Sequence, residues 1–361
     1  MPLTIRPAIA TLPVYKPGKP APLGPGGVSY KLSSNENPFP PLPGVIEAAE
    51  IACAQMNRYP DLGNVAISEA VAGTLGVRIE QIAFGTGSVG VLFHLLAALC
   101  EAGDEVVYAW RSFEAYPIAT QISRAASVQV PLGPGATHDL QAMRAAITDR
   151  TRAVLLCTPN NPTGPALSHD AVAEFVASIP DHIAVVIDEA YLEFVTDPEV
   201  VRPLELLADH PHVVVLRTFS KAYGLAGFRV GYCVAADPAI SNAVRAVSLP
   251  FGVSVAAQAA VLASLGAQEA LLERVGRIVG EREKLAAGLR DIGLEIPETQ
   301  SNFVWLEAGD RTLSHAQAFI DAGVMVRPYT SGAPEDGIRI TVGDPEANAL
   351  VLEVAAALHA P

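Results

Sequence analysis

The middle of the sequence alternates short apolar runs with stretches of helical character, and no other feature narrows the possible folds as much. Six of the runs are rich in Val, Ile or Leu and end at turn residues. They cover Glu105–Ala109, Ser127–Pro131, Ala153–Cys157, Ala184–Ile187, His212–Leu216 and Arg229–Val234. Helical stretches such as Leu140–Ile147 and His169–Ala177 separate several of them. Short buried strands joined through helices are typical of a mainly parallel sheet covered on both faces, so the sequence predicts an α/β fold.

The character of the sequence changes on either side of this region. Residues 1–44 contain many Pro and Gly residues and show no periodicity, which predicts an extended N-terminal arm rather than a helix or a long strand. After Pro250 a long charged helical stretch, Ala267–Ile292, precedes further strand-like and helical segments. We predict an arm at 1–44, a large α/β domain at 45–247 and a smaller α+β domain at 248–361.

Composition and charge argue against several classes of protein. Hydrophobic residues make up 50% of the chain and charged residues 17%, which leaves ample apolar surface for a folded core. The formal net charge of -14 argues against nucleic acid or an anionic membrane as a partner. The 4 cysteines stand far apart, without a CxxC pair or a neighbouring His cluster, so we predict no metal site and a reducing, cytoplasmic setting. The sequence shows no secretory signal, and its uncharged stretches are broken by Gly and polar residues.

The glycine-rich stretch Gly85–Gly90 has the spacing of a dinucleotide-binding fingerprint, since it follows a strand-like run and begins a helix. That fingerprint also requires an acidic residue after the second strand, whereas Asp104 and Glu105 stand at the start of the run that ends at Ala109. An NAD-dependent dehydrogenase is therefore kept only as the alternative from a different class. The stretch is either a plain tight turn or a turn whose free backbone amides bind a phosphate.

Polar residues follow three of the apolar runs, and ligands of parallel sheets bind beyond the carboxyl ends of the strands. Ala153–Cys157 is followed by Thr158–Gly164, a loop with two prolines and a glycine that carries Asn161. Ala184–Ile187 is followed by Asp188, and a carboxylate there requires a charged or hydrogen-bonding partner. The plainer interpretations of these two features are an ordinary turn and a helix N-cap.

The third run is followed by Lys221, which is the one lysine between Lys31 and Lys284. It stands between hydroxyl residues and small apolar residues, with Arg229 eight positions later. A lysine in apolar surroundings near another cation has a lowered pKa and can form a Schiff base as a nucleophilic amine; the alternative is a surface lysine. Ser220 and Arg229 carry groups that suit a phosphate.

A reactive amine, a carboxylate, phosphate donors and a glycine-rich turn together are what pyridoxal phosphate requires of a protein. On these motifs the chain resembles the fold type I pyridoxal-phosphate aminotransferases, and within them the histidinol-phosphate aminotransferase group. In that family the large α/β domain binds the cofactor. The resemblance extends over nearly the whole chain and includes the segments Leu12–Gly18, Lys31–Phe39, Asn57–Asp61, Ser301–Val304 and Ile338–Val342.

The resemblance implies three catalytic residues, Lys221, Asp188 and Tyr191. Lys221 binds the cofactor covalently and moves the proton at the substrate α-carbon. Asp188 pairs with the pyridine nitrogen, while Tyr191 and Asn161 hydrogen-bond the ring oxygen. Phe113 lies where the family stacks an aromatic ring on the cofactor.

The same resemblance implies a phosphate site, a dimer and a substrate site. The phosphate donors are Ser88, Val89, Thr218, Ser220 and Arg229. Tyr59 matches a tyrosine that reaches the phosphate across the subunit interface, which implies a homodimer with shared active sites. Arg339 matches the arginine that binds the substrate α-carboxylate, and Asn302 lies close in the same pattern. Asn35 and Tyr15, in the N-terminal motifs, complete the expected substrate-binding residues.

Two motifs bear on the substrate. The strings Gly85–Ser88 and Trp110–Pro117 are more similar to the aromatic amino acid, or phenylalanine, aminotransferase branch of this group. Many histidinol-phosphate enzymes carry an acidic or amide residue after the glycine turn, where this chain has Val89. We expect ping-pong transamination between Phe, Tyr or Trp and a 2-oxo acid such as 2-oxoglutarate. Histidinol-phosphate aminotransferase is the alternative within the family, with Tyr15, Tyr116 and Arg327 as candidate ligands of the substrate phosphate.

Overall fold

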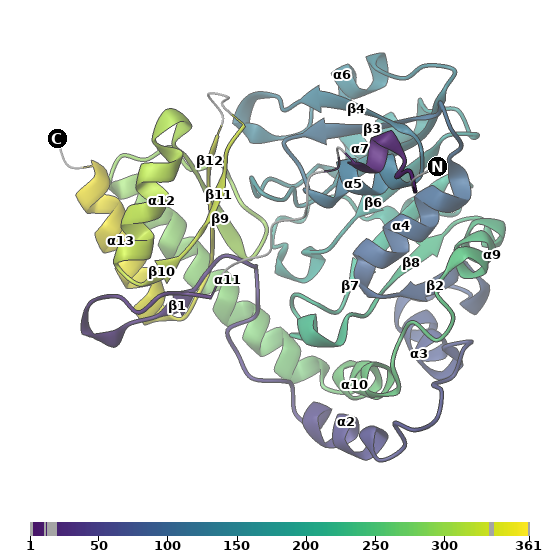
Figure 1. Ribbon diagram of the computed structural model, residues 1–361, viewed down its shortest axis with the longest axis horizontal. Helices are drawn as coiled ribbons and strands as arrows, with labels where there is room; N and C mark the ends of the chain where they lie inside the picture. Colours follow the sequence, from purple (N-terminus) through teal and green to yellow (C-terminus); the bar gives the residue numbers. More distant parts are fainter. Residues whose placement is uncertain (1–2, 11, 13–19, 332–335, 360–361) are drawn as a thin grey trace.

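The computed structural model describes residues 3–10, 12, 20–331 and 336–359 of the chain. Its main feature is a seven-stranded sheet in the order β2-β8-β7-β6-β5-β3-β4. The strands are β2 (Ile82–Gly85), β3 (Glu105–Trp110), β4 (Ala126–Pro131), β5 (Thr151–Cys157), β6 (Ala184–Asp188), β7 (Val213–Thr218) and β8 (Gly231–Ala235). Only β8 runs antiparallel to its neighbours, β2 and β7. The predicted mainly parallel sheet is confirmed (Figure 1).

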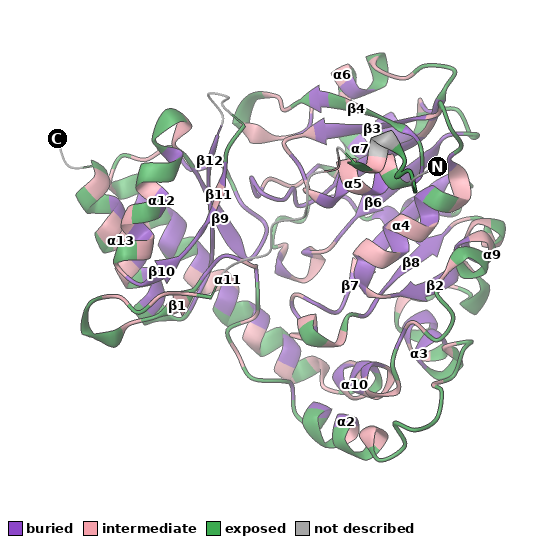
Figure 2. Ribbon diagram, viewed as in Figure 1, coloured by how far each residue is buried: buried purple, intermediate pink, exposed green. Residues whose placement is uncertain are grey.

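Both faces of this sheet are buried along six of its strands, as the continuous apolar runs predict, whereas the edge strand β4 is mostly exposed. Along β3, Val106 and Tyr108 lie in one hydrophobic cluster, and Val107 and Ala109 lie in the other. Helices α4 (Gly87–Leu99), α5 (Ala115–Ile122) and α9 (Pro238–Val247) contribute to the first cluster. Helices α6 (Leu140–Ala145), α7 (His169–Ala177) and α8 (Pro203–Leu206) contribute to the second. Figure 2 shows the strands of the sheet as mostly buried between partly exposed helices.

Local sequence signals fix where several of these helices begin. Asp139, Ser168 and Asp237 precede α6, α7 and α9, and their side chains accept hydrogen bonds from amides of the first turn. Ser254 does the same for α10 (Val255–Leu265). Such caps satisfy amides that have no partner within the helix.

A second group of elements forms the other lobe of the molecule (Figure 1). Its antiparallel sheet has the order β11-β12-β9. The elements are β9 (Phe303–Glu307), β11 (Arg327–Tyr329), β12 (Gly337–Thr341), α11 (Gln268–Asp291), α12 (Thr312–Asp321) and α13 (Pro345–His359). Helix α10 packs instead against α2 (Val45–Cys53) and α3 (Val65–Leu75), below the large sheet. The domain limits stay predictions.

The N-terminal arm differs in one detail from the expectation of a segment without helix or long strand, because it contains the single helical turn α1 (Pro7–Ala10). Its strand β1 (Tyr30–Lys31) has two residues and pairs in parallel with β10 (Val324–Met325). Gly24 and Gly323 allow the arm and the second lobe to approach, because a Cβ at either residue would collide with backbone of the other segment. A strand this short leaves no periodic signal in the sequence.

The remaining helical turns are of the 3-10 type. They are η1 (Pro25–Gly27), η2 (Ile79–Gln81), η3 (Pro134–Ala136), η4 (Leu192–Phe194), η5 (Ala226–Phe228) and η6 (Gly309–Arg311). Among the described residues no single helix has the length and apolar composition to cross a membrane, although α10 and α11, bent by 84°, meet that criterion as a pair.

Candidate active site

A cavity opens beyond the carboxyl ends of the central parallel strands. Cys157, Asp188 and Thr218, the last residues of β5, β6 and β7, line it from the large sheet. Arg327 and Arg339, on β11 and β12, line it from the second sheet. Of the residues predicted from the sequence, it collects Ser88, Val89, Phe113, Asn161, Asp188, Tyr191, Thr218, Ser220, Lys221, Arg229 and Arg339.

One end of the cavity gathers hydrogen-bond donors that suit an anion. Helix α4 begins here, so amides of its first turn, including those of Ser88 and Val89, point outward with the positive end of the helix dipole. The Thr218 hydroxyl donates to Ser220 Oγ at 3.0 Å, and Arg229 Nη1 donates to the same oxygen at 3.4 Å. Amides, hydroxyls and a guanidinium thus converge, which is the donor set of a phosphate site.

Two glycines make this convergence possible. Gly87 has φ +79, and a Cβ there would lie 2.8 Å from Arg229 Nη2. Gly231, at the start of β8, lies so close to the first turn of α4 that a Cβ would collide with the Ser88 amide nitrogen. The glycine-rich turn is therefore needed for the approach of the arginine and the strand to the helix.

The Lys221 amine lies in the middle of the cavity wall. Its Nζ donates to Ser34 O at 3.3 Å and lies 5.7 Å from the centroid of the Tyr191 ring. Burial, with the nearby charges of Arg339 and Arg229, lowers the pKa of Lys221 to about 7. A substantial fraction of this amine is uncharged at neutral pH, which a nucleophile or a base requires.

The Asp188 carboxylate is buried at the end of β6, and one of its two oxygens has a hydrogen-bond partner. Oδ2 accepts a hydrogen bond from the Tyr116 hydroxyl at 2.9 Å. Oδ1 has no hydrogen-bond partner among the described residues. Burial raises the pKa of Asp188 to about 6, although the hydrogen bond from Tyr116 lowers it. Burying a carboxylate oxygen that accepts no hydrogen bond costs free energy. A ligand that carries a hydrogen-bond donor would therefore suit this position.

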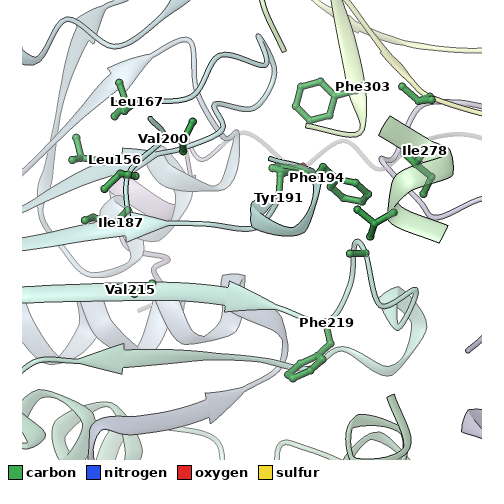
Figure 3. Close-up of a cluster of buried hydrophobic side chains, with 14 of the residues drawn as sticks. Leu156, Leu167, Ile187, Tyr191, Phe194, Val200, Val215, Phe219, Ile278 and Phe303 are labelled. Carbon is green, nitrogen blue, oxygen red and sulfur yellow. The ribbon is translucent and has the colours of Figure 1, made fainter. Parts of the chain in front are cut away.

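Tyr191 and Asn161 are held by partners from distant parts of the chain. The Tyr191 hydroxyl accepts from Asn35 Nδ2 at 2.8 Å, and its ring meets Phe303 edge-on at 5.1 Å. Figure 3 labels both residues in a cluster of buried hydrophobic side chains, Tyr191 on the loop after β6 and Phe303 at the start of β9. Asn161 Oδ1 accepts from Arg339 Nη1 at 2.7 Å.

Arg339 closes the opposite side of the cavity. Besides Asn161, its guanidinium contacts Ser33 O through Nη2 at 2.7 Å, whereas Nε has no partner within the described part of the chain. The charge lies 5.5 Å from the Phe303 ring centroid and 5.7 Å from that of Tyr329. A fixed guanidinium facing the same cavity as an amine suits a substrate carboxylate.

The comparisons with known proteins agree with this geometry. Residues 29–354 match the family described as aminotransferase class I and II. The chain belongs to the class I and II aminotransferases. It is therefore an enzyme, and the alternative of an NAD-dependent dehydrogenase is wrong.

Named relatives of this aminotransferase cover almost its whole length. It is 52% identical to an aromatic amino acid aminotransferase of Streptomyces avermitilis, over 97% of this chain and 96% of the relative. It is 49% identical to one of Thermobifida fusca, over 97% of this chain and 96% of that protein. A crystal structure of histidinol-phosphate aminotransferase from Sinorhizobium meliloti in complex with pyridoxal-5'-phosphate superimposes with a TM-score of 0.87, at 29% identity and 98% coverage of both chains.

Three predicted residues of this aminotransferase, all within the described part of the chain, are not part of the cavity wall. Asn35 and Asn302 are buried behind it, where Asn302 Nδ2 donates to Asn35 O at 3.2 Å. Tyr59 lies on the outer surface, 82% exposed and stacked on Phe251 with ring centroids 4.4 Å apart. Tyr15 lies outside the described residues. Their proposed roles stay predictions.

Other lining residues were not among the predicted site residues. They are Ser33, Ser34, Glu114, Cys157, Ala190, Arg327 and Tyr329. Glu114 directly follows Phe113, and Ser33 and Ser34 directly precede Asn35. The motifs that predicted Phe113 and Asn35 could therefore have predicted these three neighbours as well. Arg327 was predicted only as a candidate ligand for the phosphate of histidinol phosphate. Tyr329 lies on a strand that contains none of the motifs found in the sequence.

Proposed function

We propose that this enzyme exchanges the amino group of an aromatic amino acid with a 2-oxo acid, using pyridoxal 5'-phosphate. The observation that carries the proposal is the convergence of the Lys221 amine, the unsatisfied Asp188 Oδ1 and an anion-binding helix terminus in one cavity. The names of relatives at 52% and 49% identity support the substrate class.

The residues of the cavity fit this cofactor in three places. Asp188 Oδ1 is a buried acceptor that lacks a donor, as the protonated ring nitrogen of the cofactor would supply. The start of α4, where Gly87 leaves room beside Arg229, suits its phosphate. Lys221 is an amine of lowered pKa that can react with its aldehyde. Phe113 would stack on its ring, with Asn161 and Tyr191 toward the ring oxygen.

When bound, the cofactor supplies a conjugated ring that accepts the electron pair of a substrate Cα–H bond. Arg339 would bind the α-carboxylate and fix which substituent of the α-carbon faces Lys221. The Lys221 Nζ would then take up the α-proton and release it again, as an amine with a pKa of about 7 can do near neutral pH.

The part of the cavity wall that remains for a substrate side chain is aromatic. The arginine in this part already pairs with a carboxylate. Phe113 and Tyr329 line it. Arg327 Nη2 lies 2.7 Å from Glu114 Oε2, and the guanidinium is 5.7 Å from the Tyr329 ring centroid. A phosphorylated side chain would compete with Glu114 for this arginine, whereas a flat apolar ring requires no further cation. This pairing supports the aromatic substrate over histidinol phosphate.

With glutamate as amino donor, we expect phenylpyruvate or 4-hydroxyphenylpyruvate to give a kcat/KM at least about tenfold above that of imidazole acetol phosphate. Initial rates over a concentration series of each acceptor measure this difference. Reaction of the purified enzyme with all three acceptors under one buffer condition controls for variation in cofactor loading. A higher kcat/KM for the phosphorylated acceptor would assign the enzyme to histidinol-phosphate transamination instead.

We also propose a homodimer in which each site borrows Tyr59 from the partner subunit. Tyr59 stacks on Phe251, and Leu62 and Leu249, with exposed fractions of 58% and 67%, line one surface hollow together with Phe251. An exposed apolar surface of this kind favours association. The 4 cysteines are free, which fits the proposed cytoplasmic setting.

Hybrid dimers test the shared site. Tyr59→Phe and Lys221→Ala subunits, mixed in equal amounts and allowed to exchange, form hybrids with one site that carries neither substitution. We expect the mixture to recover about a quarter of wild-type activity, because random pairing makes half of the dimers hybrids. Subunit exchange is verified by native mass spectrometry. Activity no higher than the mean of the two separate variants, despite exchange, would contradict the shared site.

A further inference from the structure

Tyr116 has a buried hydroxyl that the functions assigned so far do not use. The residue lies on α5 and is fully buried, and its hydroxyl donates to Asp188 Oδ2 at 2.9 Å. Cys157, the register partner of Asp188 on β5, also lies within hydrogen-bonding reach of this hydroxyl. The hydroxyl is therefore enclosed between the ends of two central strands.

We propose that Tyr116 is a positioning residue, which fixes the rotation of the Asp188 carboxylate and leaves Oδ1 as the oxygen for the cofactor's ring nitrogen. This inference rests on the proposed function. A carboxylate at the end of a strand can rotate about its last bond, and in water both oxygens are equivalent. With a donor fixed on Oδ2, only one oxygen is left to face a ligand.

The direction of this hydrogen bond is set by burial. Burial and the neighbouring Asp188 raise the pKa of Tyr116 well above its ordinary value, so the phenol stays protonated. Burial likewise raises the pKa of the Cys157 thiol, which stays neutral. Tyr116 is thus the donor and Asp188 the acceptor at every pH at which Asp188 is ionised.

The charges around Asp188 give the hydrogen bond a further consequence. The groups that face it are the Tyr116 hydroxyl, the Ala190 amide and the charges of Glu189 and Lys221. Burial and Glu189 raise the pKa of Asp188, whereas the other three groups lower it. Removal of the Tyr116 hydroxyl would therefore raise this pKa above about 6 and bring protonation of Asp188 closer to neutral pH.

The ring of Tyr116 also packs against other aromatic rings, and a phenylalanine at this position would keep that packing. It meets Tyr108 and Phe113 edge-on, each at 5.7 Å between centroids. Tyr116→Phe keeps these contacts and removes only the donor. Tyr108→Phe is the matched control, because Tyr108 is equally buried, its hydroxyl accepts from Gln129 at 3.3 Å, and it lies on the same sheet face.

A double-mutant cycle separates positioning from general packing. The dissociation constant of pyridoxal phosphate is measured by absorbance titration of the cofactor-free protein, from pH 5 to 9, for wild type, Tyr116→Phe, Asp188→Asn, the double variant and Tyr108→Phe. We expect Tyr116→Phe to weaken binding about tenfold and to move the loss of affinity at acid pH to a higher pH. We expect no such effect in the Asp188→Asn background or from Tyr108→Phe.

The outcomes distinguish this inference from the proposed function. An equal loss in both backgrounds, or the same loss in Tyr108→Phe, would overturn the positioning role alone. An unchanged dissociation constant and pH profile in Tyr116→Phe would do the same. Failure of the wild-type protein to bind the cofactor would overturn the proposed function and this inference with it. Thermal unfolding of each cofactor-free variant checks that the fold is retained.

Discussion

Lys221→Ala should abolish covalent attachment of pyridoxal phosphate and lower turnover by roughly 10⁴-fold, because one amine serves both as nucleophile and as the base at the α-carbon. The phosphate donors at the start of α4 are untouched, so the variant should still bind the cofactor reversibly. Borohydride reduction of the loaded protein, followed by peptide mass spectrometry, locates the linkage. Turnover is measured from phenylalanine and 2-oxoglutarate.

Two exposed lysines serve as controls for this experiment. Lys31 and Lys284 pair with Glu36 at 2.9 Å and Glu281 at 2.8 Å, and neither lines the cavity. Alanine at either position should leave the linkage and the turnover unchanged, since exposed ion pairs contribute little. A reduced cofactor found on a lysine other than Lys221 would disprove the assignment.

The environment of Lys221 also predicts how capture of the cofactor depends on pH. Burial, Arg339 and Arg229 lower the pKa of the amine to about 7, so the reactive uncharged form dominates above that pH. As the pH falls through 7 the amine gains a proton and loses its nucleophilic electron pair. The rate of covalent capture should therefore be nearly constant above pH 8 and fall about tenfold per pH unit below pH 6.

Much of the fold could be predicted because burial leaves a simple pattern in the sequence. The runs that end at Cys157, Asp188 and Thr218 are apolar on both faces, and parallel strands bring their carboxyl ends to one edge. The direction of β8 was not predicted from the sequence. The connection from β7 to β8, residues 219–230, contains the 3-10 turn η5 and no crossover helix, and the two strands pair antiparallel.

The contacts that orient the site could not be predicted in the same way. Glu114 and Arg327 are separated by 213 positions, and Tyr116 and Asp188 by 72. Each pair forms because different elements meet at the cavity, and neither residue of a pair differs by composition or periodicity from its neighbours. The burial of Asn35 behind the wall likewise depends on how the arm crosses to the second lobe.

Asp188→Asn should lower transamination by roughly 10³-fold while leaving the fold intact, because an amide has nearly the same shape as the carboxylate but no charge. The Tyr116 hydroxyl favours one orientation of the amide. It donates to Oδ2 in the wild type, so keeping this hydrogen bond would place the Asn oxygen at Oδ2 and the amide NH₂ at Oδ1. A donor would then stand where the ring nitrogen needs an acceptor, and that nitrogen would lose its proton.

Asp188→Glu and the pH profile complete this test. Glutamate keeps the negative charge, but its side chain is longer by one methylene and must fit beside the buried Tyr116 and Cys157. We therefore expect an intermediate loss of turnover, and we expect turnover to keep its dependence on pH. In the wild type, burial raises the pKa of Asp188 to about 6, so turnover should decline as the pH falls through that value and the carboxylate is neutralised. Asp188→Asn should lose the part of this decline that belongs to the carboxylate, because it has no group to protonate at that position, and should keep the part that belongs to Lys221. Two results would show that the carboxylate does not hold the ring proton. One is turnover near the wild-type rate in Asp188→Asn, and the other is an unchanged decline of turnover at acid pH in that variant.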